Sequence, residues 1–321
     1  MTNGLSGPRK QFLDVLRVLA TCAVVLMHVL TGATDVTDAS IVPEYRSLLL
    51  SVMDLVTWCV PIFLLISGYL FLNPERTLTY PVMIKKYCRR IALAILLFGV
   101  PYAASELVVA ERTFRIRMIP EALKMTLTGH TWSHMWYLYL ILFLYLITPL
   151  LKKVLRVLPV WGVAAVMAVI FLGSSVAPFL NKVLDVNSIP VLPDGGVYFL
   201  YYLCGYFFAV REVCVDKGRN VWLTAAVAVL ALGMILSRTL AGFSIQMAYN
   251  YPFTVLLAVL LFAAGWNGGG DSAALAAREK NRRELRNRFR SRGCKRCRPA
   301  ASYDAERRSP AADRPCGASL P

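Results

Sequence analysis

Apolar segments of membrane-spanning length recur along most of this chain of 321 residues. A helix needs about 20 apolar residues to cross a bilayer, and within lipid only helices and closed barrels satisfy every backbone hydrogen bond. The chain is 57% apolar and 17% charged, against roughly 45–50% and about 25% in soluble domains, so no water-soluble core could bury these segments. The pattern predicts an all-α fold, a polytopic transmembrane helix bundle of about eight spans. The spans are expected at residues 12–31, 48–72, 90–109, 135–151, 158–178, 197–210, 221–237 and 249–266.

The distribution of basic residues predicts how the bundle is oriented. If the N-terminus is cytoplasmic, the inside segments carry 13 Lys and Arg and the outside segments carry 7. Cytoplasmic segments of membrane proteins are enriched in these residues, so we expect the N-terminus inside and, with an even span count, the C-terminus inside as well. The first apolar run, Phe12–Leu30, is interrupted by charged residues and has no small-residue cleavage site after it. It is therefore interpreted as a retained span and not as a signal peptide.

Residues 267–321 differ from the rest of the chain in composition. They hold 14 Lys and Arg and 6 Asp and Glu, so half of the net charge of +16 lies in this short segment. A segment rich in Arg, Ala, Gly, Pro and Ser with no long apolar run cannot bury enough surface to fold. We therefore predict a transmembrane domain at 1–266 and a basic, disordered cytoplasmic tail at 267–321. An out-of-frame reading of a GC-rich gene would give the same composition, and both interpretations of the tail stay open.

Neither metal nor nucleic acid is expected to bind. Cys294 and Cys297 have the spacing of half a zinc site, but no second pair of ligands accompanies them. The basic excess lies in the tail and in the flanks of spans, where membrane proteins normally carry it. The lipid bilayer is thus the partner that the charge pattern indicates.

Three polar residues of the first span are the main candidates for chemistry, because ionisable groups inside a membrane are costly. Arg17 and His28 are eleven residues apart, which places both on one helix face about 16 Å apart along the axis. Asp14 precedes Arg17 by three residues and can pair with it. Structural explanations remain open: Arg17 could extend to the headgroups, and His28 could be a histidine bonded inside the bundle. Imidazole is also the side chain best suited to take a proton from a hydroxyl near neutral pH.

Four short motifs then give the chain a family resemblance. They are Leu13-Asp14-x-x-Arg17 followed by His28, the segment Pro61–Tyr69 ending in Ser-Gly-Tyr, the basic segment Lys85–Ile91, and His134-Met-Trp136-Tyr137-Leu. In this order and at this spacing they resemble the acyltransferase-3 family of integral membrane acyltransferases, over residues 10–266. Lys86 and Arg89 stand where the family's basic motif has two arginines.

The resemblance implies a function for each motif. Members of the family move an acyl group, often acetyl, from coenzyme A to a hydroxyl that is commonly on a surface sugar. Acyl-CoA would then be the donor substrate, with no bound cofactor, and an envelope glycan or lipid-linked sugar would be the acceptor. The resemblance makes His28 the general base or acyl-carrying nucleophile and Arg17 the residue that orients the donor or offsets negative charge. The remaining expected roles are acyl-CoA binding by Lys86, Arg89 and Arg90, and an acceptor side formed by His134, Trp136 and Tyr137.

Structural explanations compete with these secondary roles. The basic cluster could be an ordinary cytoplasmic flank, and Trp136 and Tyr137 could belong to an interfacial aromatic belt. Ser67-Gly68 is expected to permit close helix packing, and the outer segment 111–133 is expected to be a solvated loop or to meet an anionic acceptor.

Two other classes of function compete with the acyltransferase. A transporter or flippase would place its substrate near the midplane, but such proteins usually show internal repeats, and none is visible here. A membrane sensor or anchor would accompany a further folded domain. Family members typically have ten spans, so the resemblance also suggests a C-terminus that is truncated or frame-shifted. The expected location is the bacterial cytoplasmic membrane, with multiple passes.

Overall fold

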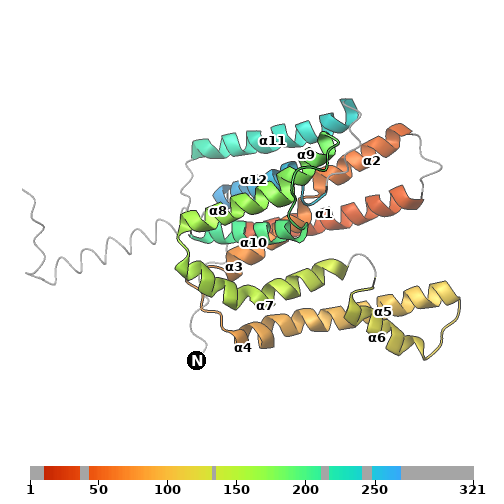
Figure 1. The fold of residues 1–321 in the computed structure, drawn as a ribbon. Coiled ribbons are helices and arrows are strands. Elements are labelled where there is room, and N and C mark those ends of the chain that lie inside the picture. Colours follow the sequence, from red (N-terminus) through yellow and green to blue (C-terminus); the bar gives the residue numbers. More distant parts are fainter. Residues whose placement is uncertain (1–10, 37–42, 132–134, 211–216, 241–247, 269–321) are drawn as a thin grey trace, which may run out of the picture. The chain divides into compact units, whose positions relative to one another are not determined.

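The computed structural model describes residues 11–36, 43–131, 135–210, 217–240 and 248–268. Every regular element in this part of the chain is helical. In chain order the elements are α1 (Gln11–Val36), α2 (Pro43–Val56), α3 (Cys59–Phe71), α4 (Tyr80–Val82), η1 (Met83–Cys88), α5 (Arg89–Glu111), α6 (Met118–Thr128), α7 (Trp136–Val157), α8 (Val160–Phe171), η3 (Leu172–Val176), α9 (Ala177–Val183), α10 (Gly195–Val210), α11 (Lys217–Leu240) and α12 (Pro252–Gly268). The all-α prediction is confirmed (Figure 1).

The helices are those of a multi-pass membrane protein. Five are long and apolar enough to cross a bilayer, namely Phe12–Ala33, Tyr45–Phe71, Tyr80–Glu111, Trp136–Val157 and Val160–Val183. Three shorter apolar helices follow, at Gly195–Val210, Trp222–Met234 and Pro252–Gly265. Each of the eight apolar segments predicted from the sequence is therefore helical. Large apolar side chains such as Leu97, Trp161 and Val169 remain exposed, as expected for faces that meet lipid.

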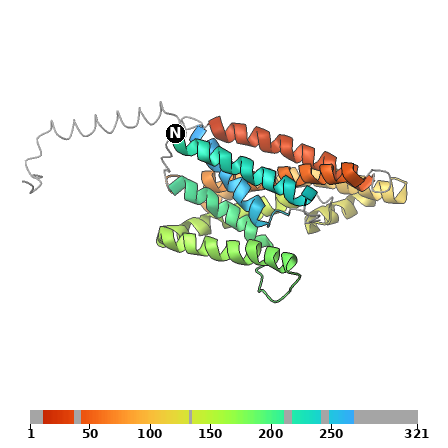
Figure 2. The same cartoon turned by 90° about the horizontal axis from the view of Figure 1, so that it is seen from above.

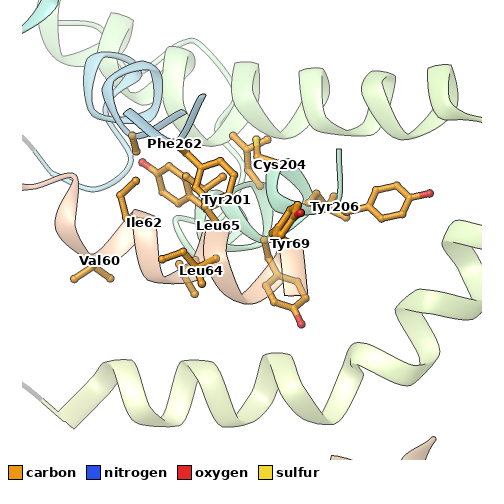
Figure 3. Packing of buried hydrophobic residues seen from close by; sticks show 14 of the residues in the cluster. Val60, Ile62, Leu64, Leu65, Tyr69, Tyr201, Cys204, Tyr206 and Phe262 are labelled. Carbon is orange, nitrogen blue, oxygen red and sulfur yellow. The ribbon is translucent and has the colours of Figure 1, made fainter. Parts of the chain in front are cut away.

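The core is built on the packing of α3 against α10, the most extensive contact between two helices in the described chain. A Cβ on Gly68 would overlap the backbone of Tyr202, and a Cβ on Gly205 would overlap the backbones of Leu65 and Tyr69. The two glycines therefore let the helix backbones approach closely. The packing role expected for Gly68 is confirmed. Figure 3 shows side chains of both helices meeting in this core.

Other helices surround this central pair. Helix α1 contacts α3, and α8 contacts α10. In Figure 2, α1 (red) and α8 (light green) lie on opposite sides of the bundle. Helix α12 contacts α1, α3 and α10 and contributes Phe262, which is fully buried. Helix α7 contacts α5 and η1. Tyr145 of α7 also contacts Phe71 of α3, and Thr148 of α7 is hydrogen-bonded to Tyr202 of α10.

The segment 111–133, which was predicted to lie outside, is more structured than the sequence indicated. It contains α6, which packs along α5 (Figure 1) and buries Met118, Ala122 and Thr126. These residues follow one another at intervals of four, so one helical stripe is buried while the charged residues stay exposed. The expectation of a loop throughout this segment was wrong. Only three of the eleven residues of α6 are buried, and this short stripe is enough to pack the helix against α5. The predicted disordered tail, apart from its first two residues, lies outside the described residues.

Candidate functional site

Helix α1 places the candidate base and the candidate arginine on the border of its buried face. The helix is unbroken from Gln11 to Val36, so Arg17 and His28 keep the separation expected from the sequence. Both side chains are half-buried, beside the fully buried residues Ala20 and Ala23. The helix can therefore present both groups to the bundle interior.

One end of the site centres on Arg17; we call it the inner end, since it is predicted to face the cytoplasm. Its Nη1 donates to Asp14 Oδ1 at 2.9 Å, and this pair remains about one-third exposed. The Arg17 guanidinium also interacts electrostatically with Tyr145 of α7, whose hydroxyl is hydrogen-bonded to Ser67 of α3. Polar groups of α1, α3 and α7 are therefore near one another at this end.

An aromatic row runs from Tyr145 through Phe71 to Tyr87. The Tyr145 and Phe71 rings are 4.7 Å apart, and the Phe71 and Tyr87 rings are 4.9 Å apart. Arg76 Nη2 donates to the Tyr87 hydroxyl at 2.5 Å, and its guanidinium carbon lies 5.0 Å from the Phe71 centroid. Lys152, at the end of α7, is 5% exposed and donates to the carbonyl of Asn73 at 2.5 Å.

The basic motif expected to bind acyl-CoA lies next to this row, at the surface of the protein. Lys86, Arg89 and Arg90 are exposed, and Lys86 Nζ lies 5.6 Å from the centroid of the Tyr87 ring. Lys86 belongs to the π-helical segment η1, and π-helical turns are frequent at functional sites. The structure therefore brings the motif to the Arg76 end of the row but does not bury it.

An aromatic cluster forms the other end of the site. The Trp136 ring lies 5.2 Å from the Tyr198 ring and 5.6 Å from the Tyr249 ring, and the two tyrosine rings are 6.2 Å apart. The Tyr249 hydroxyl donates to Met27 Sδ at 3.6 Å, so the cluster reaches α1 beside His28. We call Trp136, Tyr198 and Tyr249 the outer aromatic cluster. Trp136 and Tyr198 lie in the first turns of α7 and α10, Tyr249 lies just before α12, and all three helix ends are predicted to face outward.

Both aromatic residues of the predicted acceptor side therefore face the bundle. Trp136 lies in the outer aromatic cluster, and the Tyr137 ring lies 6.3 Å from that of Phe63. Both are half-buried and pack against the core. These contacts favour an inward-facing role over an interfacial belt. His134 lies outside the described residues.

A polar pair accompanies the outer aromatic cluster. Asn250 Nδ2 donates to Asp194 Oδ1 at 3.1 Å, close to Tyr198 and Tyr249 in the chain. The pair is exposed, so its remaining hydrogen-bonding positions face solvent. Within the described chain, no group of three or more His, Cys, Asp or Glu could hold a metal ion.

Sequence reasoning missed several residues that the structure brings to the site. Arg76 and Lys152 had counted only as charges that set orientation, and Tyr145, Tyr198 and Tyr249 had not been singled out. For Lys152 a signal existed: the residues Ile141, Leu144, Thr148 and Leu155 are buried on the same face of α7 at helical spacing. For the tyrosines the deciding contacts are between distant segments, and Arg76 lies in the irregular segment after α3, where no helical period applies.

Comparison with known proteins identified one domain. The model of the acyltransferase-3 family, described as an acyltransferase domain, matches residues 10–276. The searches of curated proteins and of solved structures found no match.

Proposed function

Because the chain belongs to the acyltransferase-3 family and is a multi-pass membrane transferase, we propose that it transfers an acyl group, acetyl foremost, from acyl-CoA to a hydroxyl of an envelope glycan or lipid-linked sugar. The donor is used on the cytoplasmic side, and the acceptor binds at the opposite end of the bundle. The membrane is the bacterial cytoplasmic membrane. Family membership makes the chain an enzyme, which separates this function from that of a transporter or flippase.

One observation carries the proposal: a single helix, α1, holds Arg17 among charged and hydroxyl groups at one end and His28 beside an aromatic cluster at the other. The two residues are about 16 Å apart along the axis of a straight helix. They cannot both contact one thioester carbonyl. If His28 is at the reacting atoms, Arg17 orients the donor at a distance, and the alternative in which it offsets charge on the reacting carbonyl is disfavoured.

The reaction at His28 is a transfer of the acyl group between sulfur and oxygen. A ring nitrogen of His28 takes the proton of the acceptor hydroxyl as its oxygen attacks the thioester carbonyl carbon. The tetrahedral intermediate collapses by breaking the C–S bond, and the departing thiolate takes the proton from the imidazolium. The products are an ester and free coenzyme A, and the histidine returns to its neutral form. In the second route, the ring nitrogen carries the acyl group before the hydroxyl accepts it.

The outer aromatic cluster supports a sugar as the acceptor. Half-buried rings offer apolar faces, while tyrosine hydroxyls offer hydrogen bonds at the wet edge. A carboxylate–amide pair, Asp194 and Asn250, lies beside them, and such groups commonly fix the orientation of a polar ligand. His134, Trp136 and Tyr137 are proposed to act on this acceptor side, and Lys86, Arg89 and Arg90 on the donor side, where polyanionic phosphates favour basic side chains.

The test measures acetyl-CoA consumption by the protein in nanodiscs, with and without an oligosaccharide acceptor. His28→Ala is expected to lower turnover by roughly 100-fold or more, since it removes the proton-transfer group. The matched control is His130→Ala, a second histidine whose side chain is exposed and hydrogen-bonded to Thr128 Oγ1; it should keep wild-type turnover. Turnover by folded His28→Ala close to that of the wild type would refute the role of His28. An absence of turnover by the folded wild type would refute the donor.

A further inference from the structure

Two cations contact the C-terminus of α3: Arg76, from the segment that directly follows the helix, and Lys152, from α7. Lys152 Nζ donates to the carbonyl oxygens of Phe71 at 3.3 Å and Asn73 at 2.5 Å, and Arg76 Nη1 donates to the carbonyl of Leu70 at 3.2 Å. Carbonyls at a helix end lack intrahelical partners and carry partial negative charge, so these contacts are favourable. They explain why one cation can be buried there.

The charges around this helix end do not balance. The helix terminus contributes about half of one negative charge, whereas Lys152 and Arg76 contribute two positive charges and the exposed Arg156 interacts electrostatically with Lys152. Within the described residues, neither Lys152 nor Arg76 forms an ion pair with a carboxylate. Lys152 is buried and Arg76 is half-buried. Two such neighbouring cations without a carboxylate partner are costly, which indicates a place where an anion would be stabilised.

Both cations retain donors for such an anion. An ammonium has three N–H donors and Lys152 uses two, while a guanidinium has five and Arg76 uses two. The Tyr87 hydroxyl, which accepts from Arg76, lies beside them, and the Phe71 and Tyr87 rings hold the guanidinium by cation–π contacts at 5.0 and 5.5 Å. A guanidinium fixed in this way is well suited to a phosphate, because its fork matches two phosphate oxygens.

We propose that Arg76 and Lys152 form a phosphate-binding site at the C-terminus of α3. The site is more buried than the basic motif of Lys86, Arg89 and Arg90, and it lies at the end of the aromatic row that leads through Tyr145 to Arg17. A phosphate held there would therefore belong to a molecule that can extend along the row. The phosphate of the acyl donor fits this position, and a phospholipid headgroup shares the same chemistry. The choice of the donor as carrier rests on the proposed function, whereas the site itself does not.

The experiment measures coenzyme A binding by calorimetry and thermal stability in nanodiscs of phosphatidylcholine, with and without phosphatidylglycerol. Lys152→Met is expected to weaken coenzyme A binding by about tenfold, since a charge-assisted hydrogen bond is lost. Lys153→Met removes the same charge from the exposed neighbouring residue and should change nothing. Arg76→Gln is the second variant, because its amide can still donate to the Leu70 carbonyl without the charge. Pantetheine, which has no phosphate, should bind all folded variants equally.

Two results would support the site and two would overturn it. Weaker coenzyme A binding by both variants, but not by Lys153→Met, supports the site with the donor as ligand. Stabilisation of the wild type by phosphatidylglycerol, lost in both variants while coenzyme A binding is unchanged, supports it with a lipid as ligand. The variants could instead be destabilised but respond to coenzyme A and to phosphatidylglycerol as the wild type does. Lys152 and Arg76 would then only stabilise the C-terminus of α3, and the proposed site would be wrong. If the wild type responds to neither ligand, the phosphate site is wrong. If it is stabilised by phosphatidylglycerol but does not bind coenzyme A, the result counts only against the proposed function.

Discussion

The two ends of the site are built from different chemistry although the same two helices supply both. At the inner end, α1 and α7 contribute Arg17, Tyr145 and Lys152, which meet hydroxyls, carbonyls and cations. At the outer end, α1 and α7 contribute Met27 and Trp136, which meet aromatic rings. Phosphates require positive charge, whereas sugars require flat apolar faces and neutral hydrogen bonds. The difference between the ends matches a charged donor and an uncharged acceptor.

The packing of α3 and α10 fixes both ends at once. The C-terminus of α3 carries the carbonyls that Lys152 and Arg76 contact, and the N-terminal part of α10 carries Tyr198. A shift of one helix along the other would therefore disturb the proposed donor and acceptor ends together, and changes placed elsewhere should affect only one end.

The largest expected effect follows from Gly205→Ala. The new methyl group would overlap the backbones of Leu65 and Tyr69, and such overpacking typically costs about 1–3 kcal/mol. We expect a lowered melting temperature and loss of both donor and acceptor binding, measured by calorimetry on the purified protein. The control is Gly233→Ala in α11, where a Cβ would meet nothing within 4 Å. Retention of acceptor binding by Gly205→Ala would show that the two ends do not depend on this common packing.

A smaller effect, confined to the outer end, is expected for Trp136→Ala. It removes the ring that contacts both Tyr198 and Tyr249, so the KM for the oligosaccharide acceptor should rise about tenfold while the KM for acetyl-CoA stays constant. Trp136→Phe keeps a ring and should restore much of the affinity. Steady-state kinetics with each substrate varied in turn measure the split, and a rise in the acetyl-CoA KM instead would place Trp136 on the donor side.

The elements were easier to predict than the contacts between them. Every predicted apolar segment is helical, since a bilayer imposes a length and composition that the sequence displays directly. The position of Arg17 and His28 on one helix also followed from local spacing. The helix α6 was missed because its buried stripe is short.

The inner and outer clusters could be predicted only in part, because distant segments build them. Lys152 meets Asn73 across 79 positions of the chain. Arg76 meets Tyr87, which is closer in sequence, but Arg76 lies in the irregular segment after α3, where no helical period predicts its contacts. The helical period of α7 would have placed Lys152 on the buried face. No pattern in the sequence around Lys152 shows that it bonds to the carbonyls of Phe71 and Asn73. Trp136 was predicted on the acceptor side, whereas its partners Tyr198 and Tyr249 resemble any other tyrosines near a membrane span.

The smallest effect is expected for the exposed part of the inner end, in the double variant Lys86→Gln with Arg89→Gln. Both side chains are exposed, so they attract the donor through solvent and should alter its KM only about threefold at low salt. Salt screens exposed charges over about 8 Å at physiological ionic strength, so the effect should disappear when acetyl-CoA kinetics are repeated in concentrated salt. Lys124→Gln with Arg117→Gln, an exposed pair in the segment predicted to lie outside, should leave the donor KM unchanged. If the KM for acetyl-CoA instead rises tenfold or more in the Lys86→Gln, Arg89→Gln variant and stays raised in concentrated salt, these residues contact the phosphates directly. The inner end would then include the basic motif.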